Sequence, residues 1–105
     1  MAVAHVVTWK VRPDRLGDFV AKAGHAKKIH ERLGARVMVV QNAVGGEPGV
    51  VDYVTSFEDL TAWTQFANAL QADTEWAEFW MSVLSDPNPT ATNIGSRLVT
   101  EIPGI

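Results

Sequence analysis

The sequence predicts an α+β fold in which one antiparallel sheet carries helices on a single face. Three observations predict it. Segments rich in β-branched residues alternate with segments of helical periodicity in the order β-α-β-β-α-β. Apolar side chains occupy both faces of the expected strands. The chain has only 105 residues but four Trp and four Phe, so its rings need more interior than a small monomer offers.

Composition limits the class of protein. Hydrophobic residues make up 47% and charged residues 20% of the chain, the balance of one folded domain spanning residues 1–105. The net charge of −3 gives no basic surface for nucleic acid, and no apolar run is long enough for a membrane span. The sequence shows no secretory signal pattern and no cysteine, so we expect a cytoplasmic protein without disulfides.

The first half of the chain divides into a strand, a helix and a hairpin. Val3 to Val11 is rich in β-branched residues, which predicts a strand. Pro13 favours helix entry, and the helix is expected from Arg15 to Leu33, where a glycine follows as a helix stop. Arg36 to Asn42 and Val50 to Phe57 predict two strands. The loop between them is rich in Gly and Pro, which predicts an antiparallel hairpin.

The second half predicts two helical pieces and a last strand. Ser56 and the acid three residues later resemble a capping box, and a helix is expected from about Asp59. The apolar stripe changes phase after Asp73, and a continuous helix could not place both parts on one face. We therefore expect a break near Ala72 to Thr74, with the Asp or the Thr capping the second piece. Thr92 to Ile102 predicts the fourth strand.

This order of elements is that of a ferredoxin-like fold. An antiparallel sheet with helices on one face should be polar on the other face. Here both faces are apolar, because alternation separates Val6 from Val7 in the first strand and Tyr53 from Val54 in the third. A second copy of the chain, packed sheet against sheet with twofold symmetry, covers the free face most economically. We therefore expect a homodimeric α+β barrel.

The chain resembles the dimeric α+β barrel superfamily over nearly its whole length. The stretch Ala4 to Val11 is similar to the first strand of stress-responsive A/B barrel proteins, in which His is followed by aliphatic residues, an aromatic and Lys. The stretches Val11 to Phe19 and Gln71 to Trp80 are similar to NIPSNAP proteins and antibiotic-biosynthesis monooxygenases. The superfamily includes cofactor-free oxygenases, polyketide cyclases, haem-degrading enzymes and proteins of unknown role. The resemblance implies the fold and the dimer and leaves the activity open.

Two of the three histidines are candidate catalytic residues. His30 falls within the apolar arc of the first helix, whereas His25 points to solvent. A buried imidazole needs a partner, so His30 is either a core residue bonded to a backbone carbonyl or an acid–base group in a pocket. In A/B barrel polyketide cyclases the matching first-strand His transfers protons, which implies that role for His5. The alternative for His5 is a strand residue held by hydrogen bonds near the barrel rim.

Aromatic side chains are the candidate ligand-binding residues. They either pack as core and dimer contacts or form a pocket for a planar apolar ligand, with Trp N–H and Tyr hydroxyl groups as orienting donors. The aromatic set consists of Trp9, Tyr53, Trp63, Phe66, Trp76, Phe79 and Trp80, and the residues assigned to ligand binding are Trp9, Tyr53, Trp63, Phe66 and Trp80. Asp52 and Arg97 lie among apolar neighbours and would pair if they faced the same cavity.

We expect no cofactor and no metal site. Haem-degrading relatives carry an Asn on the first strand, and a Trp and an iron-ligating His in the second helical region. Trp63 matches the Trp of these enzymes, but the first strand has no Asn and no His follows His30. The lack of a His in the second helical region also differs from the polyketide cyclases, which use one there. The histidines lack an i, i+4 pair on one face with accompanying acids.

Two functions are therefore open. The first is a cofactor-free enzyme of monooxygenase or cyclase type that acts on an aromatic or polyketide-like molecule, with His5 and His30 as catalytic residues. The second is a non-catalytic ligand-binding or stress-related dimer. An open cavity reached by either histidine favours the enzyme, and a filled interior favours the second function.

Overall fold

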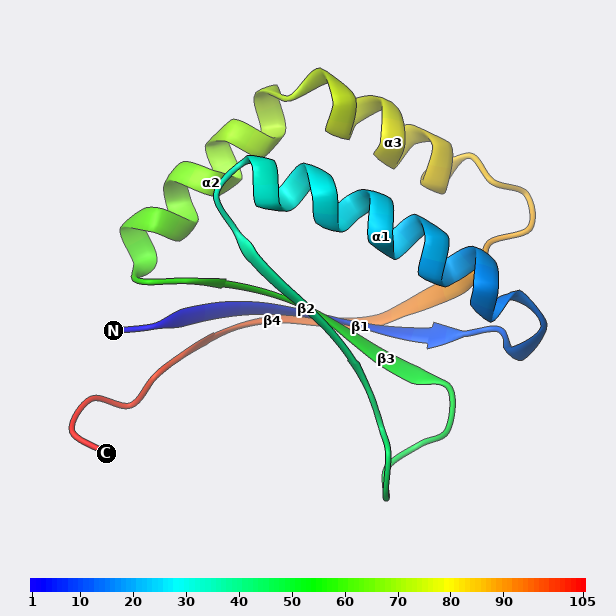
Figure 1. Cartoon of the computed structure of the whole chain (residues 1–105), viewed down its shortest axis with the longest axis horizontal. Helices are drawn as coiled ribbons and strands as arrows, with labels where there is room; N and C mark the ends of the chain where they lie inside the picture. The colour runs from blue at the N-terminus through cyan, green and yellow to red at the C-terminus, as the bar shows by residue number, and fades with distance from the viewer.

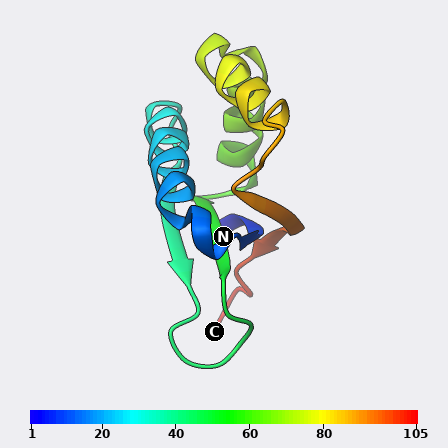
Figure 2. The ribbon, with the colours of Figure 1, turned by 90° about the vertical axis from the view of Figure 1, so that its right-hand side faces the viewer.

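A four-stranded antiparallel sheet with every helix on one face forms the framework of the chain (Figures 1 and 2). The structure is a computed structural model that describes all 105 residues. Its strands are β1 (Val3–Val11), β2 (Arg36–Gln41), β3 (Val50–Phe57) and β4 (Ala91–Thr100). Its helices are α1 (Leu16–Arg32), preceded by the short 3-10 helix η1 (Pro13–Arg15), α2 (Leu60–Ala72) and α3 (Thr74–Leu84). The strand order β2-β3-β1-β4 confirms the predicted ferredoxin-like topology.

Strand alternation divides the sheet into a face under the helices and an outer face. Odd-numbered residues of β1 and β3 face the helices, and Val3, Val11, Val51 and Tyr53 are buried there. Even-numbered residues of the same strands, such as Val54, point to the outer face. The predicted division of these strands is therefore confirmed. None of the helices combines the length and the apolarity needed to cross a membrane.

The core under the helices forms two separate clusters. One joins Val11, Phe19 and Val51, where β1 ends and α1 begins. The other joins Ala35, Phe57 and Phe66, where β3 ends and α2 passes over the sheet. The register pairs Val3 with Phe57 and Trp9 with Val51, so the two clusters lie toward opposite ends of the central strands. Only 14 of the 105 residues are buried, because the helices enclose space between the clusters and nothing covers the outer face.

The ends of the elements follow local hydrogen bonding. The capping box predicted at Ser56 is wrong, because β3 continues to Phe57 and the helix begins later. Asp59 caps α2 instead, and its carboxylate accepts a hydrogen bond from the Ala62 N–H at 2.8 Å. The predicted helix break is confirmed, since the Asp73 carboxylate caps α3 by accepting from the Trp76 N–H at 2.9 Å. β4 ends two residues before the predicted Ile102.

The α2 cap gives a first prediction. Replacing Asp59 with Ala removes the acceptor for the Ala62 N–H and is expected to lower the free energy of unfolding by about 1 kcal/mol. Urea unfolding followed by circular dichroism measures the change. Glu58→Ala is the matched control, because Glu58 is the neighbouring acid and makes no hydrogen bond in the structure. Equal losses in the two variants would show that the cap contributes nothing specific.

Candidate functional site

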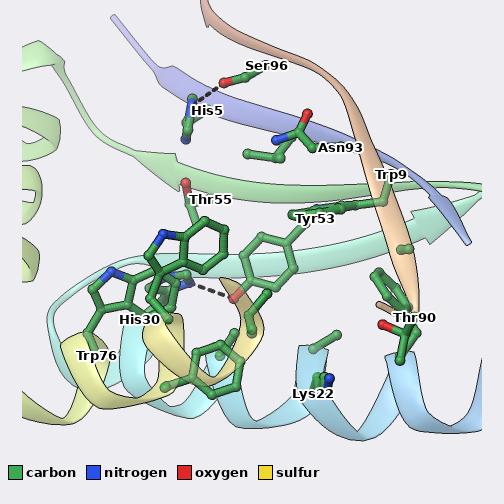
Figure 3. Close-up of a pocket in the computed structure, with 18 of the residues that line it drawn as sticks. His5, Trp9, Lys22, His30, Tyr53, Thr55, Trp76, Thr90, Asn93 and Ser96 are labelled. Atoms are coloured by element: carbon green, nitrogen blue, oxygen red, sulfur yellow. Dashed lines mark hydrogen bonds between the residues drawn. The ribbon is translucent and has the colours of Figure 1, made fainter. Parts of the chain in front are cut away.

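A cavity of about 340 Å³ lies between the central strands, α1 and α3, and we call it the central cavity. Its size falls within the range of roughly 300–1,000 Å³ typical of small-molecule sites. Figure 3 shows side chains from the sheet and from both helices converging on it. The aromatic residues in its wall are Trp9, Phe19, Tyr53, Phe66, Trp76, Phe79 and Trp80. The interior of the single chain is therefore open and not filled by its own rings.

Most of the residues predicted from the sequence meet in this cavity. His5, Trp9, His30, Tyr53, Phe66 and Trp80 all line it. Trp63 does not, although the sequence placed it in the pocket. It packs against the cluster of Ala35, Phe57 and Phe66, because the first turns of α2 lie over the end of β3 and away from α3. The 3–4 spacing of α2 turns Phe66 toward His30, with the two ring centroids 5.5 Å apart.

His30 lies in the wall of the central cavity with one nitrogen unpartnered. The residue is only 7% exposed, as its place on the apolar arc of α1 predicts. Its Nδ1 lies 2.6 Å from the Tyr53 hydroxyl oxygen, so its partner is a side chain and not the expected backbone carbonyl (Figure 3). Its Nε2 is buried and has no hydrogen-bond partner. An unpaired buried nitrogen is costly, and such a group marks a place for a ligand or water.

Burial keeps both His30 and Tyr53 uncharged. Desolvation, reinforced by the nearby His5, lowers the pKa of His30 to about 4. Burial and the charge of Glu31 raise the pKa of Tyr53 above its ordinary value. Near neutral pH the site therefore presents a neutral imidazole and a protonated phenol.

His5 reaches the same cavity from β1. Its Nε2 lies 2.9 Å from the Ser96 hydroxyl on the adjacent strand β4 (Figure 3). Partial burial lowers its pKa, so it too is biased toward the neutral form. His5 is thus a hydrogen-bonded strand residue, and it also lines the cavity.

Helix α3 provides a flat aromatic wall. The rings of Trp76 and Trp80 lie 5.6 Å apart and nearly parallel, at 14°. Trp76 also contacts His30, with ring centroids 4.6 Å apart. None of the α3 residues is fully buried, although the helix carries two Trp and one Phe. These rings pack beside open space, which suits them to stack on a planar molecule.

The charged side chains near the cavity are paired. The Lys22 side chain lines the cavity, and its ammonium nitrogen lies 3.1 Å from the Asp86 carboxylate. The hydrogen bond from the Asn88 N–H and, after it, the hydrogen bond from Lys22 lower the pKa of Asp86.

His25 is half exposed, as predicted, and its ring contacts the ring of Phe79. Asp52 and Arg97 do not pair: both lie on the outer face, and Asp52 accepts a hydrogen bond from Thr8 at 2.6 Å. No three His, Asp or Glu side chains converge as metal ligands.

Several lining residues escaped the sequence-based prediction. They are Lys22, Thr55, Thr90, Asn93 and Ser96. Trp76 and Phe79 belong to the predicted aromatic set, and both line the cavity beside Trp80. The positions of Asn93 and Ser96 depend on how β4 pairs with β1. This pairing shifts between Thr8 and Trp9 of β1, and the sequence of one strand does not show such a shift.

Comparisons with known proteins identify the fold. Neither a protein-family model nor a curated protein matches the sequence. A NIPSNAP family protein from Agrobacterium tumefaciens superposes with a TM-score of 0.73 at 11% identity, over 99% of this chain and 89% of that one. A NIPSNAP domain protein from Burkholderia xenovorans gives a TM-score of 0.70 at 14% identity, over 100% and 98%. The resemblance to NIPSNAP-like proteins is confirmed for the fold.

An enzyme has the same fold. A variant of SnoaB, a cofactor-independent oxygenase from Streptomyces nogalater, superposes with a TM-score of 0.68 at 13% identity, over 95% of this chain and 92% of that one. The fold is therefore shared by an oxygenase and by uncharacterised NIPSNAP-like proteins, and it does not choose between a catalytic and a non-catalytic role.

Proposed function

We propose that this chain is a cofactor-free enzyme that binds an uncharged, planar aromatic molecule in the central cavity and moves a proton on it. The observation that carries the proposal is His30, a buried neutral imidazole whose Nε2 has no partner in an open aromatic cavity. A filled interior would favour a purely structural dimer, and the cavity is open. The fold is compatible with this function, because a cofactor-independent oxygenase has the same fold.

The charges around the cavity favour an uncharged ligand. Both cavity histidines have lowered pKa values, and the Lys22 ammonium is paired with Asp86. A carboxylate or ammonium group in this cavity would lose its hydration without gaining an unpaired opposite charge. The nearly parallel rings of Trp76 and Trp80 supply a stacking surface for a flat molecule.

The two histidines take different parts in the proposed reaction. His30 is deeply buried and fixed by Tyr53, so it orients a polar group of the ligand. His5 is less buried, and its hydrogen bond to the Ser96 hydroxyl is exposed, so we assign the proton transfer to His5. The indole and phenyl groups exclude water and hold the flat ligand between the two imidazoles.

We also propose that the chain forms a homodimer through the outer sheet face. One row across the four strands consists of Met38, Val54, Val6 and Arg97. Met38 is 60% exposed in the single chain, and Val40 and Val99 in the flanking rows are about 40% exposed. The exposed apolar side chains of this face need a cover, and a second copy of the chain supplies a matching surface.

Anthrone, an uncharged tricyclic ketone with an acidic C–H bond, is a suitable probe of the catalytic proposal. We expect the wild-type protein to accelerate exchange of that hydrogen in D₂O, followed by NMR without added cofactor. Replacing His5 with Ala is expected to reduce the rate about 100-fold, the usual contribution of a general base. Trp63→Phe is the control, because Trp63 lies outside the cavity, and it should retain the wild-type rate. Oxygen uptake with the same probe tests the oxygenase activity.

The outcomes separate the two functions. If anthrone quenches tryptophan fluorescence saturably but its hydrogen exchange is not accelerated, the protein is a non-catalytic binding protein. Equal exchange rates in the wild type and His5→Ala would show that His5 does not transfer the proton.

A further inference from the structure

We propose that Tyr53 fixes His30 in the tautomer with its proton on Nε2, so that the central cavity presents a hydrogen-bond donor and selects ligands with a carbonyl oxygen at that point. The identity of the ligand rests on the function proposed above, whereas the tautomer is a property of the free protein.

Counting donors and acceptors distinguishes the two neutral tautomers. The Tyr53 hydroxyl and His30 Nδ1 share one hydrogen bond, and no other protein group bonds to that hydroxyl. If Tyr53 donates to Nδ1, the imidazole proton lies on Nε2 and only that N–H lacks a partner. If Nδ1 donates to Tyr53, then both the phenolic O–H and the Nε2 lone pair lack partners. Each unpaired buried polar group costs free energy, so the first arrangement is favoured.

The surroundings of the ring exclude the charged alternative near neutral pH. Phe66 and Trp76 contact the imidazole, with centroids at 5.5 and 4.6 Å, and no carboxylate bonds to it. Burial favours the neutral form, in keeping with the lowered pKa of His30. His30 therefore does not take up a second proton that would make both nitrogens donors.

The unpaired Nε2–H favours one class of ligand. It is the one buried side-chain nitrogen or oxygen atom without a partner, and a carbonyl oxygen can accept a hydrogen bond from it. A hydrocarbon of the same shape leaves that N–H unpaired. The same donor would stabilise the oxygen of an enolate formed when His5 removes an adjacent proton. Tyr53 is in this account a positioning residue, because it acts through His30.

The tautomer can be measured directly. Long-range ¹H–¹⁵N correlation spectra of the free wild-type protein at pH 7 should show His30 with a protonated Nε2 and an unprotonated Nδ1. Tyr53→Phe should mix the two tautomers, because Nδ1 loses its donor. Thr64→Val is the control, since it also removes one hydroxyl group, but Thr64 lies on α2 outside the cavity lining and bonds to the Leu60 carbonyl. A wild-type spectrum with the proton on Nδ1 would overturn the inference, and so would an unchanged tautomer in Tyr53→Phe.

Ligand choice is measured with two molecules of one shape. Anthrone carries a carbonyl oxygen that 9,10-dihydroanthracene lacks. Titration followed by tryptophan fluorescence is expected to show wild-type binding of anthrone about tenfold tighter, the value of one hydrogen bond. The preference should shrink in Tyr53→Phe and persist in Thr64→Val, because Thr64 lies outside the cavity lining. Equal affinities with the Nε2 proton in place would overturn the carbonyl selection. Binding of neither molecule would instead overturn the proposed function and leave the tautomer as measured.

Discussion

Lowering the pH from 6.5 to 4 is expected to destabilise the folded chain by up to about 3 kcal/mol through His30. Burial, followed by the influence of His5, holds the pKa of His30 at about 4 in the folded chain, below the ordinary value of 6.5. Between these pH values the unfolded chain binds a proton that the folded chain does not bind. Stability is therefore complete above pH 6.5 and falls as the pH falls toward 4. Urea unfolding at a series of pH values measures the slope.

Two variants separate His30 from the other titrating groups. His30→Phe should remove most of this slope, and His25→Phe should retain it because His25 is half exposed. His5 contributes in the same direction, since burial lowers its pKa as well. The pKa values of Asp73 and Asp86 lie below the ordinary 3.8. The stability that these two carboxylates contribute is therefore lost only when the pH falls further into the acid range. A His30→Phe variant with the wild-type slope would show that His30 titrates normally.

Replacing Val54 with Asp is expected to convert the proposed homodimer to monomer. Val54 lies at the centre of the outer face, opposite Val6 on the neighbouring strand. An unpaired carboxylate buried there would cost several kcal/mol, which raises the dissociation constant roughly 100-fold or more. Light scattering over micromolar concentrations measures the mass, and circular dichroism checks the fold.

Val20→Asp is the matched control for the dimer. It introduces the same change on α1, where Val20 is 59% exposed and lies away from the outer face. The wild type and this control should have twice the mass of Val54→Asp. A monomeric wild type, or a dimeric Val54→Asp, would contradict sheet-to-sheet dimerisation and leave the apolar outer face without its proposed cover.

Most of the fold could be predicted from local patterns. Alternation in β1 and β3 gave the correct faces, and the change of helical phase after Asp73 gave the break between α2 and α3. These features depend on residues that are close together in the sequence, so their periodicity can be recognised from a single sequence. The start of α2 near Asp59 was also predicted correctly, but the capping box was wrongly assigned to Ser56. The choice of Asp59 depends on how far β3 continues.

The site could be predicted only in part. His5, His30 and Tyr53 were chosen for their chemistry and their faces, and all three line the central cavity. Trp63 shares a helical stripe with Phe66 but sits over the end of the sheet, which periodicity alone cannot show. The hydrogen bond between His30 and Tyr53 joins residues 23 positions apart. The unpaired Nε2 follows from that tertiary contact and from the absence of any other, so no sequence pattern displays it.

A crystal structure of the protein grown with anthrone tests the central claim most directly. The proposed function and the proposed tautomer together predict the ligand in the central cavity, flat against the α3 rings Trp76 and Trp80. Its carbonyl oxygen should lie within hydrogen-bond distance of His30 Nε2, about 2.7–3.2 Å. An anthrone molecule bound elsewhere, or bound in the cavity with its oxygen turned away from His30, would contradict the claim.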